Sequence, residues 1–206
     1  MIRRFASVAA IGAVAAGLSA CSLLSTPKPV QLYRFGALET PATDVAAATP
    51  APVSVALRRI EFPEASKGDR ILGVTGTEAA YIKGARWVSP AETLFSDSLE
   101  SAFAAQPDRV RLLGRREPGL STRVLNVDVT TFEARYAAPG ATPEAVITVR
   151  ARMVVLPERS VTNERTFTVR QPAAANRVSS IVEAFDLASR DLNVQIVDWT
   201  AGTTAP

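Results

Sequence analysis

The chain has 206 residues, 47% of them hydrophobic and 21% charged, which is enough apolar material for one core of ordinary size. It has no His and a single Cys, which excludes His-based acid–base catalysis, Cys/His metal sites, internal disulfides and Cys–His nucleophilic pairs. Of its 23 basic residues, Arg3 and Arg4 lie in a predicted leader, so 21 remain against 20 acidic residues. This balance gives no argument for nucleic-acid binding.

The first twenty residues have the layout of an export signal. Met1 to Arg4 is short and positive, Phe5 to Gly17 is uncharged and mostly apolar, and a small-residue segment follows. As a helix, the apolar run of about 13 residues would be about 20 Å long, too short for a bilayer core of about 30 Å. We therefore predict that residues 1–20 are a lipoprotein signal peptide, which is removed.

Leu18, Ser19, Ala20 and Cys21 resemble the lipobox of bacterial lipoproteins. In that motif the Cys thiol receives a diacylglyceryl group, the signal is cut before it, and the new amino group is acylated; several chains anchor a protein stably, whereas one binds marginally. The alternative is ordinary cleavage that leaves a free thiol, but Leu18 fits an A-x-A site poorly. Ser22 stands where an Asp would resemble an inner-membrane retention signal. This favours the outer membrane, facing the periplasm.

Residues 22–29 form a short segment with two Pro, and residues 40–52 are rich in Ala, Thr and Pro. Both segments are predicted to be spacers with little capacity to bury surface. We therefore assign residues 21–52 to the lipidated Cys and a linker, with a short aromatic strand at 31–36. A single folded domain is expected over 53–201, and residues 202–206 are expected to be a loose tail.

The first half of the domain predicts three strands and a helix. Apolar residues alternate over 53–58, and shorter strands are predicted over 70–74 and 80–83, with Gly76 and Gly84 as breaks. A helix should follow, with Ser89 as its N-cap and Pro90 in its first turn, and end at Gln106. One face of this helix must be buried, because apolar residues recur at helical spacing through it.

The second half predicts a meander and a closing helix. Strands are expected over 109–113, 124–136, 146–155 and 161–170, with a turn at Pro139-Gly140. The apolar phase of the long strand changes near Thr130-Thr131, which predicts a β-bulge there. Apolar residues then recur every three or four positions over 178–199, and Asn176 is the expected helix cap.

These elements predict an α/β fold: a mixed sheet of about five to seven strands with a meander, covered by two main helices. The chain contains neither a G-x-G-x-x-G turn nor a G-x-x-x-x-G-K-[ST] loop. A doubly wound nucleotide-binding fold is therefore not expected.

No group of residues has the pattern of an active site. The carboxylates Glu92, Asp97 and Glu100 are expected on the solvated face of the first helix. Ser96 and Ser98 lack both a G-x-S-x-G setting and a His partner. Three further carboxylates are expected on the exposed side of the last helix: Asp186, Asp191 and Asp198. No loop has EF-hand spacing, although a metal site built only of carboxylates stays open; we expect no catalytic residue, no metal and no cofactor.

Two surface features are candidates for contact with a partner or with lipid. The densest basic group comprises Arg109, Arg111, Arg115 and Arg116, and it suits lipid head groups or an acidic partner. Arg150 and Arg152 share the outward face of one strand. The alternative for all of these is a solubilising role. The two tryptophans, Trp87 and Trp199, are expected to pack at helix ends, with a protein interface as the alternative for each.

The order and spacing of several segments resemble those of the ABC-type transport auxiliary lipoproteins, the PqiC-like lipoproteins of Gram-negative bacteria. The resemblance covers nearly the whole mature chain and is carried by these features: the lipobox at Cys21, Leu32-Tyr33-Arg34-Phe35, the strand from Val53 to Phe62 ending at Pro63, Asp69-Arg70-Ile71, and Arg86-Trp87 before a helix with Leu94, Leu99 and Phe103. The chain departs from the family in carrying Pro63-Glu64-Ala65-Ser66 where many members have Pro-x-x-Leu.

The resemblance implies an anticodon-binding-like fold, also seen in the N-terminal domain of TolB. It further implies a non-catalytic role beside an ABC permease, its ATPase and an MCE-domain protein that forms a lipid passage across the periplasm. The lipoprotein would dock this passage at the outer membrane, as a homo-oligomeric ring of several copies. Two other functions stay open: a lipid-binding carrier or envelope scaffold, with any lipid pocket under the helices, and, less favoured, an envelope enzyme.

Overall fold

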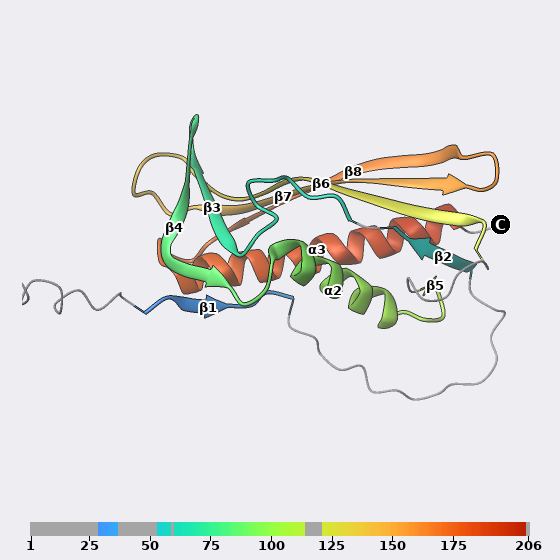
Figure 1. The fold of residues 1–206 in the computed structure, drawn as a ribbon, viewed down its shortest axis with the longest axis horizontal. Coiled ribbons are helices and arrows are strands. Elements are labelled where there is room, and N and C mark those ends of the chain that lie inside the picture. The colour runs from blue at the N-terminus through green and yellow to red at the C-terminus, as the bar shows by residue number, and fades with distance from the viewer. Residues whose placement is uncertain (1–28, 37–52, 59, 114–120, 205–206) are drawn as a thin grey trace, which may run out of the picture. The chain divides into compact units, whose positions relative to one another are not determined.

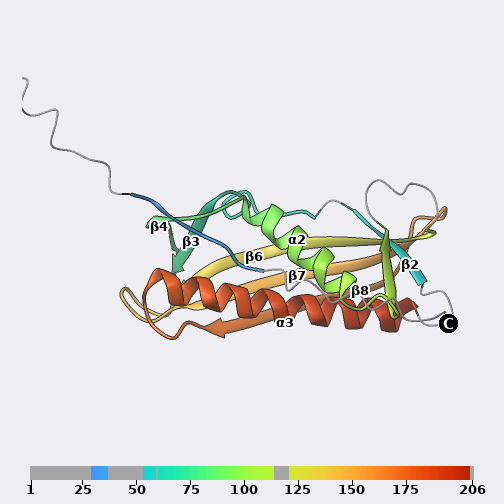
Figure 2. The ribbon, with the colours of Figure 1, turned by 90° about the horizontal axis from the view of Figure 1, so that it is seen from below.

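The computed structural model describes residues 29–36, 53–58, 60–113 and 121–204. The chain divides into two compact units, residues 1–30 and 31–206, and the described helices and strands all belong to the second. They are β1 (Gln31–Tyr33), β2 (Val53–Leu57), β3 (Arg70–Thr75), β4 (Glu78–Trp87), α2 (Ala91–Ala104), β5 (Val110–Leu113), β6 (Arg123–Tyr136), β7 (Glu144–Val155), β8 (Ser160–Pro172) and α3 (Val178–Thr204). Both helices lie against the same face of one sheet (Figures 1 and 2).

The long strand β6 organises this sheet. Along one side it pairs antiparallel with β7, which in turn pairs with β8, and this meander is the one predicted. Along its other side β6 pairs in parallel with β2 at residues 124–125 and with β3 at residues 134–136. Strand β5 extends the β2 arm, and β4 and β1 extend the β3 arm. The mixed α/β fold is thus confirmed, with eight strands among the described residues rather than five to seven.

The β-bulge predicted near Thr130-Thr131 is confirmed. The register of β6 against β7 shifts between Val129 and Thr131. Without the bulge, Val129 and Phe132 would point to opposite faces of the sheet, because they are three positions apart in the strand. The shift turns both toward the helices, and both are buried.

Strand β4 continues through Gly84, where the sequence predicted a break. The pairing of β4 with β3 jumps from Leu72–Tyr81 to Arg70–Arg86, and Gly84 lies in this interruption with φ +77°. Beyond it, residues 85–87 also pair with β1 along the other side of the strand. A glycine that permits a positive φ therefore bends the strand without ending it.

The starts of both helices differ from the predicted caps. Pro90, not Ser89, is the N-cap residue of α2, and no side chain caps this helix. Its first free N–H groups instead donate to a preceding loop, Ala91 N–H to the Gly68 carbonyl (2.9 Å) and Glu92 N–H to the Lys67 carbonyl (3.2 Å). A tertiary contact thus supplies the acceptors that a capping side chain would supply.

Helix α3 also departs from its predicted bounds. The carbonyl of Arg177 accepts the Ile181 N–H (3.1 Å), which places Arg177 at the N-cap, while the Asn176 amide donates to the Gly140 carbonyl (3.1 Å). At the other end the helix runs to Thr204, so the expected loose tail is helical from Gly202 to that residue.

The folded unit begins at β1 rather than near Val53. Phe35 is 1% exposed, and its ring centroid lies 4.9 Å from that of Trp87 and 5.3 Å from that of Phe132. Phe132 in turn stacks on Phe185 of α3 at 4.8 Å. The short segment after β1 is thus part of the aromatic core that joins the sheet to α3.

Gly36 fixes this segment between the two helices. Its N–H donates to Asp186 Oδ1 of α3 (2.7 Å), and a Cβ at this position would lie 2.6 Å from Ser98 Cβ of α2. We expect Gly36→Ala to cost about 2–4 kcal/mol of unfolding free energy, because its φ of +65° is strained for Ala and the methyl group would clash. Gly76→Ala is the control, since it has a similar φ of +59° but open space around it. Equal urea midpoints for the two variants would refute the close approach to Ser98.

Candidate functional site

The carboxylates and serines considered as catalytic candidates have structural roles or face solvent. Asp97 and Glu100 are exposed on α2, and Ser96 Oγ donates to Glu100 at 3.3 Å. Ser98 is buried and accepts a hydrogen bond from the Asn193 amide at 2.8 Å. Within the described ranges, no three His, Cys, Asp or Glu residues are grouped so as to hold a metal ion.

The carboxylates of α3 also have local partners. Asp186 accepts the Gly36 N–H and pairs with Arg190 (2.9 Å), so it holds the segment after β1 against α3. Asp191 accepts a hydrogen bond from the Gln195 amide at 3.2 Å. Asp191 and Asp198 are exposed, as predicted, whereas Asp186 is half-buried, so the prediction of an exposed side chain is wrong for Asp186.

Trp87 packs in the core and is not at the surface. It is 2% exposed and meets Phe185 edge to face, with ring centroids 5.4 Å apart. The packing role expected for this residue is what the structure shows, and its side chain leaves no surface for a partner or a lipid. Its position near the start of α2 gave no signal that it would be enclosed by α3 as well.

Arg150 and Arg152 lie on the sheet surface that faces away from the helices, among opposite charges. Arg150 Nη2 donates to Asp128 Oδ2 at 2.7 Å, and this hydrogen bond raises the pKa of Arg150 above its usual value. Arg152 stands opposite Asn126 on one side and Glu164 on the other. The two arginines therefore do not form a separate basic patch.

Arg109 and Trp199 are brought together at the C-terminal end of α3. Arg109 Nη1 pairs with Asp198, the residue before Trp199, and also donates to Gln106 Oε1 at 2.6 Å. The Trp199 ring meets that of Phe167 edge to face at 6.0 Å, and the Arg165 guanidinium lies 4.9 Å from the Phe167 ring centroid. A hollow of about 460 Å³ adjoins these groups, and we call it the α3-end groove. It is lined by Arg165, Gln195, Asp198, Trp199, Gly202 and Thr203.

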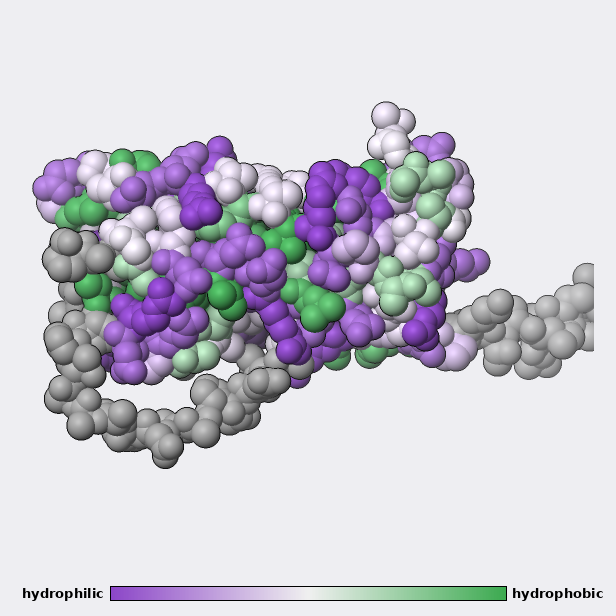
Figure 3. Space-filling model, turned by 180° about the vertical axis from the view of Figure 1, so that it is seen from behind, coloured by the Kyte–Doolittle hydropathy of each residue, from purple (hydrophilic) through white to green (hydrophobic). Residues whose placement is uncertain are grey.

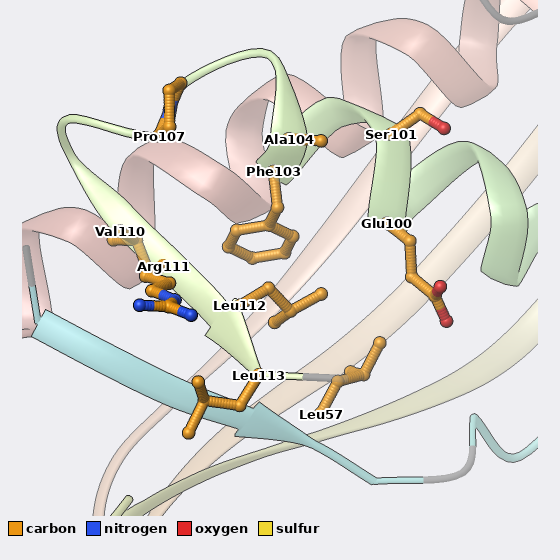
Figure 4. Close-up of a pocket in the computed structure, with 10 residues that line it drawn as sticks. All are labelled: Leu57, Glu100, Ser101, Phe103, Ala104, Pro107, Val110, Arg111, Leu112 and Leu113. Carbon is orange, nitrogen blue, oxygen red and sulfur yellow. The ribbon is translucent and has the colours of Figure 1, made fainter. Parts of the chain in front are cut away.

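A second pocket of about 350 Å³ lies between the end of α2 and β5 (Figure 4). Phe103 points from the helix toward Leu112 of β5, and Leu57 and Leu113 lie below them. Arg111 also lines this pocket. The pocket and the α3-end groove are both at the end of the sheet that carries β2 and β5.

The α3-end groove includes residues that the sequence did not single out. The sequence pattern predicts Asp198 only as an exposed carboxylate, and it gives no signal for Arg165. Arg109 and Asp198 are 89 residues apart, so no local pattern announces their pairing. Arg115, Arg116, Cys21 and the lipobox residues Leu18, Ser19 and Ala20 lie outside the described residues.

The described helices are not suited to crossing a membrane, since none is both long and apolar enough to do so. Hydrophobic residues on the face shown in Figure 3 are separated by hydrophilic ones. The tip of the β3–β4 hairpin projects beyond the rest of the sheet (Figures 1 and 3).

Residues 36–197 match the family model of the ABC-type transport auxiliary lipoprotein component. Among solved structures, a Xanthomonas campestris protein of the DUF330 family is similar, with 25% identity and a TM-score of 0.67 over 84% of this chain and 96% of that one. A hypothetical protein from Chlamydia trachomatis shares the fold, with 12% identity and a TM-score of 0.50 over 74% of this chain and 97% of that one. A search of curated proteins found no match.

Proposed function

This chain belongs to the family of ABC-type transport auxiliary lipoprotein components, and from that membership we propose that it serves an MCE-associated system that moves lipids or hydrophobic compounds across the periplasm. It docks the system at the outer membrane, held there by acyl chains on Cys21. It acts without catalysis and as several copies. Its partners are the MCE-domain protein and, through it, the ABC permease and ATPase.

The observation that carries this proposal is the separation between β1, where the linker after Cys21 meets the folded unit, and the α3-end groove, which is the candidate contact surface. The tether, by which we mean the part of the linker between Cys21 and β1, leads directly into β1. Shortly after β1, the Gly36 N–H donates a hydrogen bond to Asp186 in the first half of α3. The α3-end groove begins near Asp198, twelve residues further along the helix, about 18 Å away at 1.5 Å per residue. Figure 1 shows β1 and β5 toward opposite ends of the folded unit. A lipid-anchored adaptor needs such an arrangement, with one end at the membrane and the other free for a partner.

The α3-end groove has the residue types expected of a protein contact. Tryptophan and arginine are enriched among residues that dominate binding energy, and here Trp199 is half-buried beside Arg165 and the Arg109–Asp198 pair. An aromatic ring already held by Phe167 loses little conformational freedom on binding. We therefore propose that this groove contacts the MCE-domain protein.

Substitution of Gly202 tests this contact without disturbing the core. A Cβ at Gly202 meets nothing within 4 Å, and Gly202 lies in α3, where Gln is the better helix former. We expect Gly202→Gln to fill part of the groove and lower the affinity for the MCE-domain protein at least about tenfold, which corresponds to about 1.4 kcal/mol. The measurement is titration of the purified partner against the detergent-solubilised lipoprotein.

Gly68→Gln is the matched control, because Gly68 also has open space around it and lies in the loop before β3, outside the groove. Equal affinities for the two variants would exclude the groove as the contact. Failure of the tagged wild-type protein to co-purify with any MCE-domain or ABC component from gently solubilised membranes would refute the proposed function itself.

The alternative function, a lipid-binding carrier, draws on the pocket between α2 and β5. Its volume of about 350 Å³ is at the lower end of the range for small-molecule sites, and its floor is apolar. The space beneath the helices, where the carrier function would place a lipid pocket, is filled by Phe35, Phe95, Phe132 and Phe185. Phospholipid bound to the protein in native mass spectrometry would favour the carrier.

A further inference from the structure

The outward face of β1 carries Leu32, which at 62% is the most exposed large hydrophobic side chain among the described residues. Leu32 pairs with Arg86, whereas the neighbouring pairs place Ala85 and Trp87 on the core side. The N–H of Val88 donates to the Tyr33 carbonyl (2.7 Å), so the pairing continues one step beyond β4. Val88, 48% exposed, therefore shares the outward side with Leu32.

Two arginines accompany these aliphatic side chains. Arg34 is exposed and follows Leu32 by two positions, and Arg86 is directly opposite Leu32. Arg86 also pairs with Asp69 (2.8 Å), with both side chains 45% exposed. We call Leu32, Arg34, Arg86 and Val88 the β1 face. Aliphatic groups beside arginines are the combination that binds the interface of an anionic bilayer.

The β1 face is held rigidly by the residues that follow it. Phe35 is buried in the aromatic core, and Gly36 is bonded to Asp186 and lies close to Ser98. The face therefore keeps a fixed orientation relative to the sheet and to α3. A membrane contact here would orient the whole folded unit.

The length of the tether keeps this face near the membrane. Gln31 lies ten positions after Cys21, and ten steps of fully extended chain span at most about 36 Å. Helix α3, with 27 residues, is itself about 40 Å long. The lipid anchor therefore keeps β1 within a distance of the membrane that is no greater than the length of α3. In the sequence, β1 is the first described strand after Cys21.

We propose that the β1 face rests on the phospholipid leaflet that holds the lipid anchor, with Leu32 and Val88 at the level of the head groups and Arg34 and Arg86 against phosphate oxygens. The inference rests on the acylation of Cys21 in the proposed function. It goes beyond that function by assigning the residues that fix how the domain stands on the membrane.

Site-directed spin labelling tests this assignment, because the only Cys of the chain is the predicted acylation site. Leu32→Cys and Val88→Cys, each in the full-length lipidated chain, are labelled with a nitroxide and reconstituted in vesicles of phosphatidylethanolamine and phosphatidylglycerol. Val161→Cys is the matched control, since Val161 is 52% exposed but lies at the start of β8, outside the β1 face. We expect labels at 32 and 88 to be several-fold less accessible to a water-soluble nickel chelate than the label at 161, and more accessible to oxygen.

Equal nickel accessibility at the three positions, in protein that sediments with the vesicles, would overturn the β1 face as a membrane contact. Protection at 32 and 88 that arises only on addition of an MCE-domain protein would also overturn it, in favour of a protein contact. Failure of the wild-type chain to sediment with vesicles would instead refute the anchor, and the inference would fall with it.

Discussion

The Cys21→Ser variant is expected to lose all labelling by radioactive fatty acid, and its folded unit is expected to lose the firm attachment that acyl chains provide. The physical reason is that, in the proposed function, acyl chains on Cys21 supply the firm attachment, whereas the β1 face contributes two exposed aliphatic side chains, Leu32 and Val88. Several acyl chains anchor a protein stably at about 0.8 kcal/mol per buried CH₂, whereas a small interfacial contact is reversible. The measurement is membrane fractionation with immunodetection.

The uncut signal peptide of this variant requires a control. A chain in which residues 1–21 are replaced by a signal that is cleaved without lipidation should be recovered entirely in the periplasmic fraction. Ser22→Ala should remain lipidated and membrane-bound, because it leaves the lipobox intact. Membrane attachment of the chain with the replaced signal would show that the folded unit binds the envelope without acyl groups.

Periodicity predicted the parts of the fold that depend on local alternation. The phase change between Val129 and Phe132 located the bulge in β6, because one sheet face must stay buried on both sides of it. The predictions of a strand break at Gly84 and of an N-cap at Ser89 are wrong because local sequence does not determine the roles of these residues. Their roles depend on contacts distant in sequence, namely the pairing of β1 with β4 and the carbonyls of Lys67 and Gly68 at the start of α2.

The candidate site was less predictable than the fold. The basic cluster in the sequence includes Arg109, but its ion-pair partner Asp198 and the neighbouring Arg165 come from elements that only the tertiary fold brings together. Trp87 and Trp199 look alike as single aromatic residues near helix ends. Only the packing of α3 distinguishes them, because it encloses Trp87 against Phe185 and leaves Trp199 half-buried.

The boundary of the domain depends on Phe35, and Phe35→Ala is the second variant with a large expected effect. We expect it to lower the free energy of unfolding by about 3–5 kcal/mol, the usual cost of truncating a buried Phe. Phe35 touches Trp87 and Phe132, and Phe132 stacks on Phe185, so the cavity would open where β1, the sheet and α3 meet. The measurement is urea unfolding of the mature chain, followed by fluorescence of its two Trp residues.

Leu32→Ala is the control for this variant, because Leu32 belongs to the same short segment but is mostly exposed, and such changes usually stay within about 0.5 kcal/mol. A loss of less than about 1 kcal/mol for Phe35→Ala would mean that the segment before residue 53 is peripheral, as its short length and flanking spacers suggested. The full loss would be a large share of a typical stability of about 5–15 kcal/mol. A chain that starts at Val53 would then be marginally stable at best, because the segment that connects the lipid anchor to the domain also completes its core.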